Sequence, residues 1–218
     1  MELILAEKPS AARNFAKALG GKTGNYAGTE YKITNLRGHV MGLLPPDKQV
    51  PTEKVEFYKS WDLENLPWNL NDFTWKKGIL SGCKDIISGL KDELKEADCV
   101  VIATDVDPSG EGELLAWEAL EKCGWRGPTK RMYFADEAPA SVQKAFRERK
   151  TLPSMDKDGD YVKAVVRERW DLASMQFTRA ATLVARKKGF RTVVRQGRLK
   201  SVMVKLTGDQ LKAYNEYV

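Results

Sequence analysis

The sequence predicts an α/β protein in which helices cover both faces of a mostly parallel sheet, followed by the start of a helical subdomain. Cys99–Ala103 is a short apolar run, rich in β-branched residues and bounded by polar ones, which is typical of a strand buried on both faces. Glu2–Ala6 is predicted as the first strand, and strand and helix patterns alternate after it. This alternation predicts parallel strands joined by helices.

The remaining elements follow in a regular order. The other predicted strands cover residues 30–36 and 129–134. The predicted helices cover residues 11–19, residues 79–94, a segment beginning at Glu113, and residues 139–150. Residues 45–72 form a long Pro-, Asp- and Asn-rich connection, and we expect its aromatic residues Trp61 and Trp68 to hold it in place.

Composition describes an ordinary globular protein. Of the 218 residues, 42% are apolar and 30% are charged, and no apolar run approaches the length of a membrane span. The chain begins without the basic segment and cleavage site of a signal peptide, and its three cysteines form no CxxC pair. We therefore expect a protein of the reducing cytoplasm, with no membrane contact, zinc site or disulfide framework.

The net charge of +6 is unevenly distributed along the chain. Residues 151–218 contain 14 Lys and Arg against 7 Asp and Glu, so they carry +7 and the first 150 residues carry −1. We expect one domain over residues 1–153 and a basic helical segment over residues 154–218 that begins a second domain. A basic segment favours a polyanionic partner, although a solvated helix face would have the same composition.

Four carboxylates crowd into the turn after the strand Cys99–Ala103. They are Asp105, Asp107, Glu111 and Glu113, with Pro108, Ser109, Gly110 and Gly112 among them. Open α/β sheets place their functional sites at such strand ends, and acids this close repel one another unless a cation lies among them. Oxygen ligands on a short loop suit Mg²⁺. The alternative is a solvated acidic turn that caps a helix, because acids also favour helix N-termini.

Two further candidates lie in the first domain. Glu7 follows the first strand as Asp105 follows a later one, and neighbouring parallel strands would bring the two together, although a lone Glu after a strand is more often a surface residue. His39, the only histidine, is either structural or functional. Gly21-Lys22-Thr23 is not a P-loop, because the glycine expected five positions earlier is Ala16 and the segment follows a helix.

Several spaced motifs resemble one family. Glu7-Lys8-Pro9-Ser10 after the first strand, and Asp105-x-Asp107 with Gly-Glu after a later strand, resemble the Toprim domain of type IA DNA topoisomerases, on the topoisomerase III side. RGHVMGL, RMYFADEAPASVQKAF, DLASMQFTRAATL and QGRLKSVMVKL are similar to further segments of that family and extend the resemblance over nearly the whole chain. The resemblance implies a Toprim (Rossmann-like) α/β fold and the start of a domain with a single-strand groove.

The resemblance also implies roles for individual residues. In such enzymes a tyrosine attacks DNA and leaves a free 3′-hydroxyl, and Glu7 would be the acid that protonates the leaving oxygen. Crowding by the neighbouring acids would raise the pKa of Glu7. Lys8 would stabilise charge at the phosphate. Mg²⁺, or Mn²⁺, would be held by Glu7, Asp105, Asp107 and Glu111. Single-stranded DNA would be contacted by Lys8, His39, Arg179, Arg195 and Arg198.

The chain departs from the family pattern in three places. Pro108 and Ser109 stand where an ungapped alignment expects Arg and Glu, so the third metal carboxylate is Glu111 or, by another alignment, Glu113. Gly197-Arg198-Leu199-Lys200-Ser201 replaces a segment with Gln and Thr. No segment resembles the family's Tyr-Pro-Arg-Thr motif, so we expect the nucleophilic tyrosine in further domains of the same protein. Two alternatives are another Toprim enzyme, such as a primase or OLD-type nuclease, and a non-catalytic fragment that binds single-stranded DNA.

Overall fold

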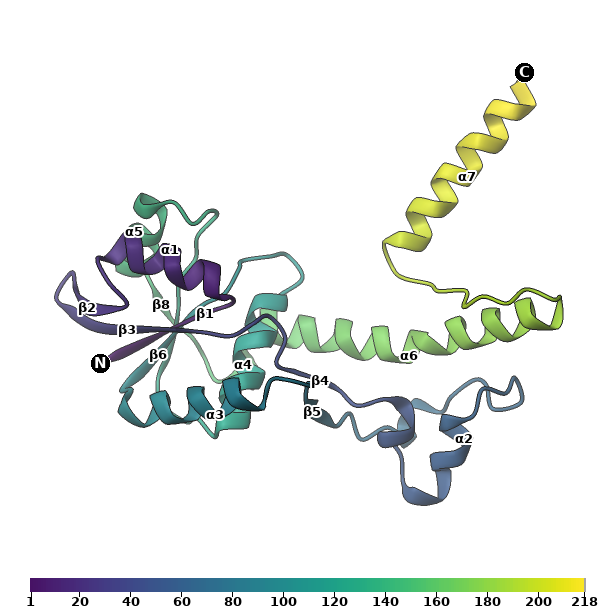
Figure 1. Cartoon of the computed structure of the whole chain (residues 1–218), viewed down its shortest axis with the longest axis horizontal. Coiled ribbons are helices and arrows are strands. Elements are labelled where there is room, and N and C mark those ends of the chain that lie inside the picture. The colour runs from purple at the N-terminus through teal and green to yellow at the C-terminus, as the bar shows by residue number, and fades with distance from the viewer. Residues whose placement is uncertain (218) are drawn as a thin grey trace. The chain divides into compact units, whose positions relative to one another are not determined.

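The computed structural model describes residues 1–217 and groups the chain into two compact units (Figure 1). Unit 1 comprises Met1–Gly42 and Lys77–Arg167, and unit 2 comprises Leu43–Lys76 and Glu168–Val218. These units divide the chain after Gly42, Lys76 and Arg167. The domain boundary expected between residues 153 and 154 stays a prediction. Each unit is described here by itself.

Unit 1 is built on a six-stranded sheet with the order β2-β3-β1-β6-β7-β8. Its strands are β1 (Glu2–Ala6), β2 (Thr23–Tyr26), β3 (Thr29–Asn35), β6 (Cys99–Ala103), β7 (Thr129–Arg131) and β8 (Lys150–Thr151). The four central strands run parallel, and β2 and β8 pair antiparallel at the two edges. The predicted mostly parallel sheet is therefore confirmed. A separate two-stranded sheet pairs β4 (Met41–Leu43) with β5 (Lys77–Ile79).

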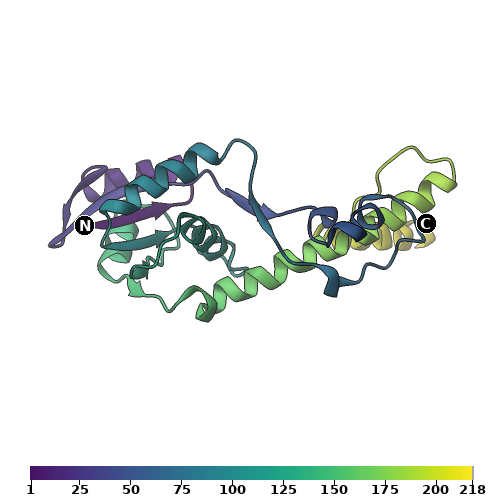
Figure 2. The same cartoon turned by 90° about the horizontal axis from the view of Figure 1, so that it is seen from below.

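Helices cover both faces of the main sheet, as the continuous apolar strands require. On one face Ile4 and Ala6 pack with residues of α1 (Pro9–Leu19) and α5 (Pro139–Arg147). On the other face Leu3 and Leu5 pack with residues of α3 (Lys84–Glu93) and α4 (Glu111–Cys123). Figures 1 and 2 show the sheet between these two pairs of helices. Successive residues of a strand point to opposite faces of the sheet. Because both faces are covered, the side chains on both sides of β1 are buried, and its sequence is one continuous apolar run.

Unit 2 combines the excursion Leu43–Lys76 with the later helices. It contains α2 (Val55–Lys59), most of α6 (Gly159–Lys187) and α7 (Lys200–Tyr217). Its small core is formed by Tyr58, Trp68, Phe73 and Leu172, so that the excursion packs on α6 (Figure 2). Short 3-10 helices occupy Pro46–Lys48, Thr52–Lys54, Leu70–Asp72, Leu94–Glu96 and Met155–Lys157 in the two units together. Among residues 1–217, no helix is both long enough and apolar enough to cross a membrane.

The two tryptophans of the long connection behave differently. The prediction that aromatic residues hold this connection is confirmed for Trp68, which is 5% exposed in the core of unit 2. Trp61 is 41% exposed and is not a member of that core. The helix expected from Glu113 begins earlier, at Glu111, because the left-handed backbone of Gly110 ends the turn there.

Candidate active site at the strand ends

The site is positioned by two adjacent strands. β1 and β6 pair in parallel, with Ala6 opposite Ala103 at their carboxyl ends. The turns that follow are therefore neighbours, and the backbone N–H of Asp105 donates a hydrogen bond to Glu7 Oε2 over 3.1 Å. Lys8 Nζ lies 3.1 Å from Asp105 Oδ2 and forms an ion pair with it. The structure thus brings the adjacent residues Glu7 and Lys8 together with Asp105, which lies 98 and 97 positions later in the sequence.

Two glycines allow the acidic turn to pack closely. Gly110 has a φ of 75°, and a Cβ atom built on it would lie 2.1 Å from the Asp160 carbonyl oxygen. A Cβ atom on Gly112 would lie 2.1 Å from the Asp105 carbonyl oxygen. Both distances are far shorter than any van der Waals contact, so glycine is required at both positions.

Asp107 caps the helix that follows the turn. Its Oδ1 accepts hydrogen bonds from the backbone N–H of Ser109 over 2.7 Å and from the Ser109 hydroxyl, and its Oδ2 accepts one from the N–H of Gly112 over 3.3 Å. Burial acts to raise the pKa of Asp107, but the hydrogen bonds from Ser109 and Gly112 outweigh it and lower the pKa. Helix capping, the alternative considered for this turn, is therefore one real role of Asp107.

Glu111 is held between the side chains of Arg167 and His39. Arg167 Nη2 donates to Glu111 Oε2 over 2.5 Å, and His39 Nε2 lies 2.8 Å from Glu111 Oε1. The hydrogen bond from Arg167, followed by the one from His39, lowers the pKa of Glu111. Arg167 also donates to the Ser109 hydroxyl, so it links α6 to the acidic turn on both sides of Gly110. Arg167 did not emerge from the sequence, because nothing local links it to Glu111, 56 positions away.

The surroundings of Glu7 raise the pKa of its carboxyl group. Burial is the largest cause, and the charges of Asp105 and Glu111 add to it. The sequence analysis expected a raised pKa for Glu7, and the direction agrees. It attributed the rise to crowding by neighbouring acids, however, whereas burial is the larger cause. The pKa of Lys8 is raised by its hydrogen bond to Asp105. The strand ends therefore combine a carboxyl of raised pKa with further acidic side chains and the ammonium group of Lys8.

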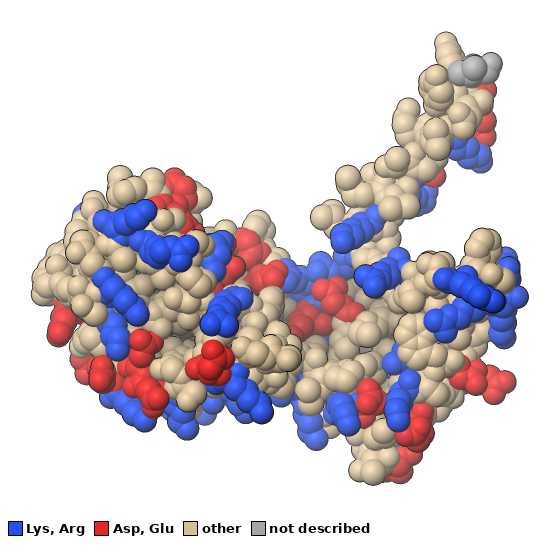
Figure 3. Space-filling view, in the orientation of Figure 1, with Lys and Arg blue, Asp and Glu red and all other residues tan. Residues whose placement is uncertain are grey.

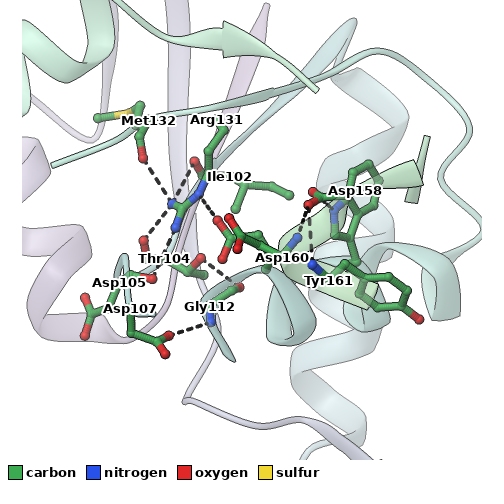
Figure 4. A network of polar contacts seen from close by, with 12 residues as sticks. Ile102, Thr104, Asp105, Asp107, Gly112, Arg131, Met132, Asp158, Asp160 and Tyr161 are labelled. Carbon is green, nitrogen blue, oxygen red and sulfur yellow. Dashed lines mark hydrogen bonds and ion pairs between the residues drawn. The ribbon is translucent and has the colours of Figure 1, made fainter. Parts of the chain in front are cut away.

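Glu113 lies beneath the turn and not on its surface. Its side chain is buried and accepts a hydrogen bond from Arg131 Nε over 2.6 Å. Arg131, which is fully buried at the end of β7, also donates to the carbonyl oxygens of Thr104 and Asp105 over 2.7 and 3.1 Å (Figure 4). The Arg131–Glu113 pair thus fixes the backbone from which Asp105 projects. Of the two carboxylates that the alternative alignments offer, Glu111 is the more exposed, with 40% of its side chain accessible against 3% for Glu113.

A comparison with family models identifies this arrangement. A model described as the Toprim domain matches residues 2–136, which include β1, β6 and the acidic turn. The chain belongs to the Toprim family.

Known relatives of this Toprim protein are much longer. A DNA topoisomerase 3 from Staphylococcus epidermidis is 30% identical over 151 residues, which are 68% of this chain and 20% of the relative. A DNA topoisomerase 3 from Bacillus subtilis is 30% identical over 184 residues, which are 83% of this chain and 24% of the relative. The chain therefore spans about a fifth to a quarter of the length of these relatives. A full-length topoisomerase I structure from Thermotoga maritima matches 68% of this chain and 21% of its own, with a TM-score of 0.48 and 23% identity.

The Toprim site has the donor chemistry of a metal site without its geometry. Within residues 1–217, no group of three or more His, Cys, Asp or Glu side chains is arranged to hold a metal ion. The carboxylate oxygens of Asp105, Asp107 and Glu111 nevertheless fit Mg²⁺, which prefers hard oxygen ligands. In the structure these oxygens accept hydrogen bonds from the protein itself. Asp105 accepts one from Lys8, and Asp107 accepts from Ser109 and Gly112. Glu111 is hydrogen-bonded to His39 and Arg167. A bound cation would replace some of these donors.

The residues predicted to contact DNA are divided between the units. Lys8 and His39 belong to the Toprim site of unit 1, whereas three arginines belong to unit 2. Arg195 is exposed. Arg198 forms a two-point pair with Asp171, over 2.7 and 3.1 Å. Arg179 is only 7% exposed and donates to two backbone carbonyls, so its surroundings are those of a structural residue. The DNA-contact roles of all five residues stay predictions.

Proposed function

We propose that this Toprim domain is the metal- and acid-bearing part of a type IA DNA topoisomerase that cleaves and rejoins single-stranded DNA. The observation that carries the proposal is the meeting of Glu7 and Lys8, from the end of β1, with Asp105, from the end of β6. The names of the relatives support it, because they favour a topoisomerase over a primase or an OLD-type nuclease. Such an enzyme works in the cytoplasm, at the nucleoid.

The proposed chemistry assigns one task to each residue. Glu7, whose pKa is raised mainly by burial, donates a proton to the 3′-oxygen that leaves when DNA is cleaved. Lys8 balances the negative charge that develops at the scissile phosphate. Asp105, Asp107 and Glu111 would hold Mg²⁺, with Glu7 beside them, and a bound Mg²⁺ neutralises and orients phosphate oxygens.

The nucleophile of the proposed reaction is a tyrosine outside these 218 residues. This part of the proposal rests on the sequence, which has no segment resembling Tyr-Pro-Arg-Thr. The chain would then act together with other domains of the same protein, and DNA, mainly single-stranded, would be its partner. His39, Arg195 and Arg198 would contact the DNA backbone.

Calorimetric titration with Mg²⁺ tests the metal site. We expect weak binding to the 218-residue chain and none to the double variant Asp105→Asn/Asp107→Asn, because it removes two of the anionic oxygen ligands. The matched control is Glu93→Gln/Glu96→Gln, which removes two carboxylates near Lys32 that lie 3.6 and 3.7 Å from its Nζ. This control should bind like the wild type. Equal binding by all three proteins, with circular dichroism confirming their folds, would contradict the proposal.

A further inference from the structure

Unit 2 leaves several aromatic side chains at the surface, Trp170 and Phe177 more so than Trp61, but Trp61 packs against the guanidinium groups of two arginines. Its neighbours along the chain, Tyr58 and Trp68, are 1% and 5% exposed, whereas Trp61 is 41% exposed. The segment that carries it is held by its own hydrogen bonds: Asn65 Nδ2 donates to the Phe57 carbonyl over 3.1 Å and to the Ser60 hydroxyl over 2.5 Å. Trp61 is therefore an exposed ring on an ordered segment.

The buried side chain of Arg179 packs against the indole ring of Trp61. Arg179 Nη1 donates to the carbonyl oxygens of Tyr58 over 2.5 Å and Ser60 over 3.2 Å, directly before Trp61 in the sequence. The guanidinium carbon of Arg179 lies 5.5 Å from the centroid of the Trp61 ring and 4.8 Å from that of Trp68. Arg179 thus fixes the backbone of the segment and packs against the indole at the same time.

The positive charge at this place is not neutralised by an ion pair. Over residues 1–217 no carboxylate forms an ion pair with Arg179, whose Nε is buried without a hydrogen-bond partner, and Asp47 acts on its charge only from farther away. Arg186, two helical turns farther along α6, is exposed, and its guanidinium carbon lies 5.7 Å from the same Trp61 centroid. Figure 3 shows Lys and Arg side chains gathered at this end of α6, where Lys187, Lys188 and Arg191 follow.

We propose that Trp61 is a stacking platform for one base of single-stranded DNA and that Arg186 contacts a phosphate next to that base. This inference rests on the proposed function, which supplies single-stranded DNA as the partner. An exposed indole offers a flat surface on which any base can stack, and two guanidinium groups beside it attract the phosphate chain. Arg186 is free to turn from the indole to a phosphate because its side chain is exposed. Arg179 is a positioning residue, since it acts through the backbone of the segment.

Phe57 provides a matched control on the same segment. It is 42% exposed, nearly the same as Trp61, and its ring packs edge-on against Tyr58 at 5.2 Å. In the part of the chain that the structure describes, no guanidinium lies over the Phe57 ring. If exposed aromatic area alone mattered, Trp61→Leu and Phe57→Leu would have the same effect on DNA binding.

The experiment measures binding of the 218-residue chain to two labelled oligonucleotides by fluorescence anisotropy. One is a single-stranded thymidine oligomer, and the other has the same length and phosphates with abasic sugars. We expect Trp61→Leu to weaken binding of the thymidine oligomer by about 5- to 100-fold, the range that loss of one stacked base produces. Binding of the abasic oligomer should not change, Phe57→Leu should match the wild type on both, and Trp61→Phe should restore part of the affinity.

The salt dependence of binding separates the two residues. Arg186→Gln should flatten the slope of log K against log salt by about 0.7, the value for one phosphate contact of a single strand. Trp61→Leu should leave that slope unchanged, since stacking releases no counterions. Equal affinity of Trp61→Leu and the wild type for the thymidine oligomer would overturn the stacking inference while the proposed function stands. If the wild type binds neither oligomer, the proposed function fails and the inference fails with it.

Discussion

Each unit of the molecule buries an arginine, and the two arginines have opposite surroundings. Arg131 in unit 1 is fully buried, pairs with the carboxylate of Glu113 and donates to four backbone carbonyls beneath the acidic turn. Arg179 in unit 2 is 7% exposed, packs against Trp61 and Trp68, and donates to two carbonyls without a carboxylate in ion-pair contact.

This difference separates two uses of a buried charge. A charge that is paired and fully hydrogen-bonded in the interior fixes geometry, and the Arg131–Glu113 pair does so for the strand end that bears Asp105. A charge packed on indoles, without an acid beside it, keeps its attraction for anions outside the protein. We infer that unit 1 uses its arginine to build a site, whereas unit 2 uses its arginine to support a surface for a polyanion.

The largest effect is expected from Arg131→Met. Removing one partner leaves Glu113 buried and uncompensated, so we expect unit 1 to lose about 3–5 kcal/mol of its free energy of unfolding. Native-state hydrogen exchange measures this unit by unit: the amides of β6 and β7 should lose protection while those of α2 keep it. The double variant Arg131→Met/Glu113→Leu should recover most of the loss, because no charge is left unpaired. A single variant as stable as the wild type would contradict the role given to the pair.

Arg179→Met should have a smaller effect, confined to unit 2. The carbonyls of Tyr58 and Ser60 lose their donor and two indoles lose a guanidinium, but no charge is left behind, so we expect a loss of about 1–3 kcal/mol. In the same exchange experiment the amides around α2 should lose protection, whereas the protection of the amides of β6 should stay unchanged. A loss as large as that of Arg131→Met would remove the distinction between the two arginines.

Lowering the pH should decrease the stability of unit 1 because Glu2 becomes protonated. Burial acts to raise the pKa of Glu2, but its hydrogen bonds to Arg149 and Lys130, each of 2.6 Å, outweigh it and lower the pKa. Its contribution to stability is therefore fully present above the unfolded pKa of about 4.3 and is lost as the pH falls through the lower folded value. Glu2→Gln should cost about 1 kcal/mol at pH 7 and nothing at the lowest pH. Urea unfolding followed from pH 7 to pH 3 measures both values, and a pH-independent cost would contradict this explanation.

The sequence predicts the centre of the sheet better than its edges. β1 and β6 are buried on both faces, so their composition alone marks them as strands. The edge strand β2, with the sequence TGNY, and the three-residue strands β4 and β5 have no such signal, because their pairing depends on distant segments. The start of α4 was misplaced by two residues because the sequence does not reveal that the left-handed backbone of Gly110 ends the turn before Glu111.

The candidate site was predictable where it depends on topology. Parallel strands bring their carboxyl ends together, and this places Glu7 beside Asp105. The partners Arg131 and Arg167 could not be predicted, because each reaches its carboxylate from another element of the fold. The family resemblance implied that Arg179 contacts DNA, but it could not show that this side chain is buried, because helical spacing does not tell which face of α6 is covered.

Paramagnetic broadening by Mn²⁺ tests the location of the metal site most directly. In the isotope-labelled 218-residue chain, we expect substoichiometric Mn²⁺ to broaden the amide signals of Lys8, Val106 and Ser109 first, since these residues flank the proposed carboxylates. Asp105→Asn/Asp107→Asn should abolish this local broadening. Broadening centred on another acidic segment, such as residues 156–160, or spread evenly over the chain, would contradict a metal site at the ends of β1 and β6.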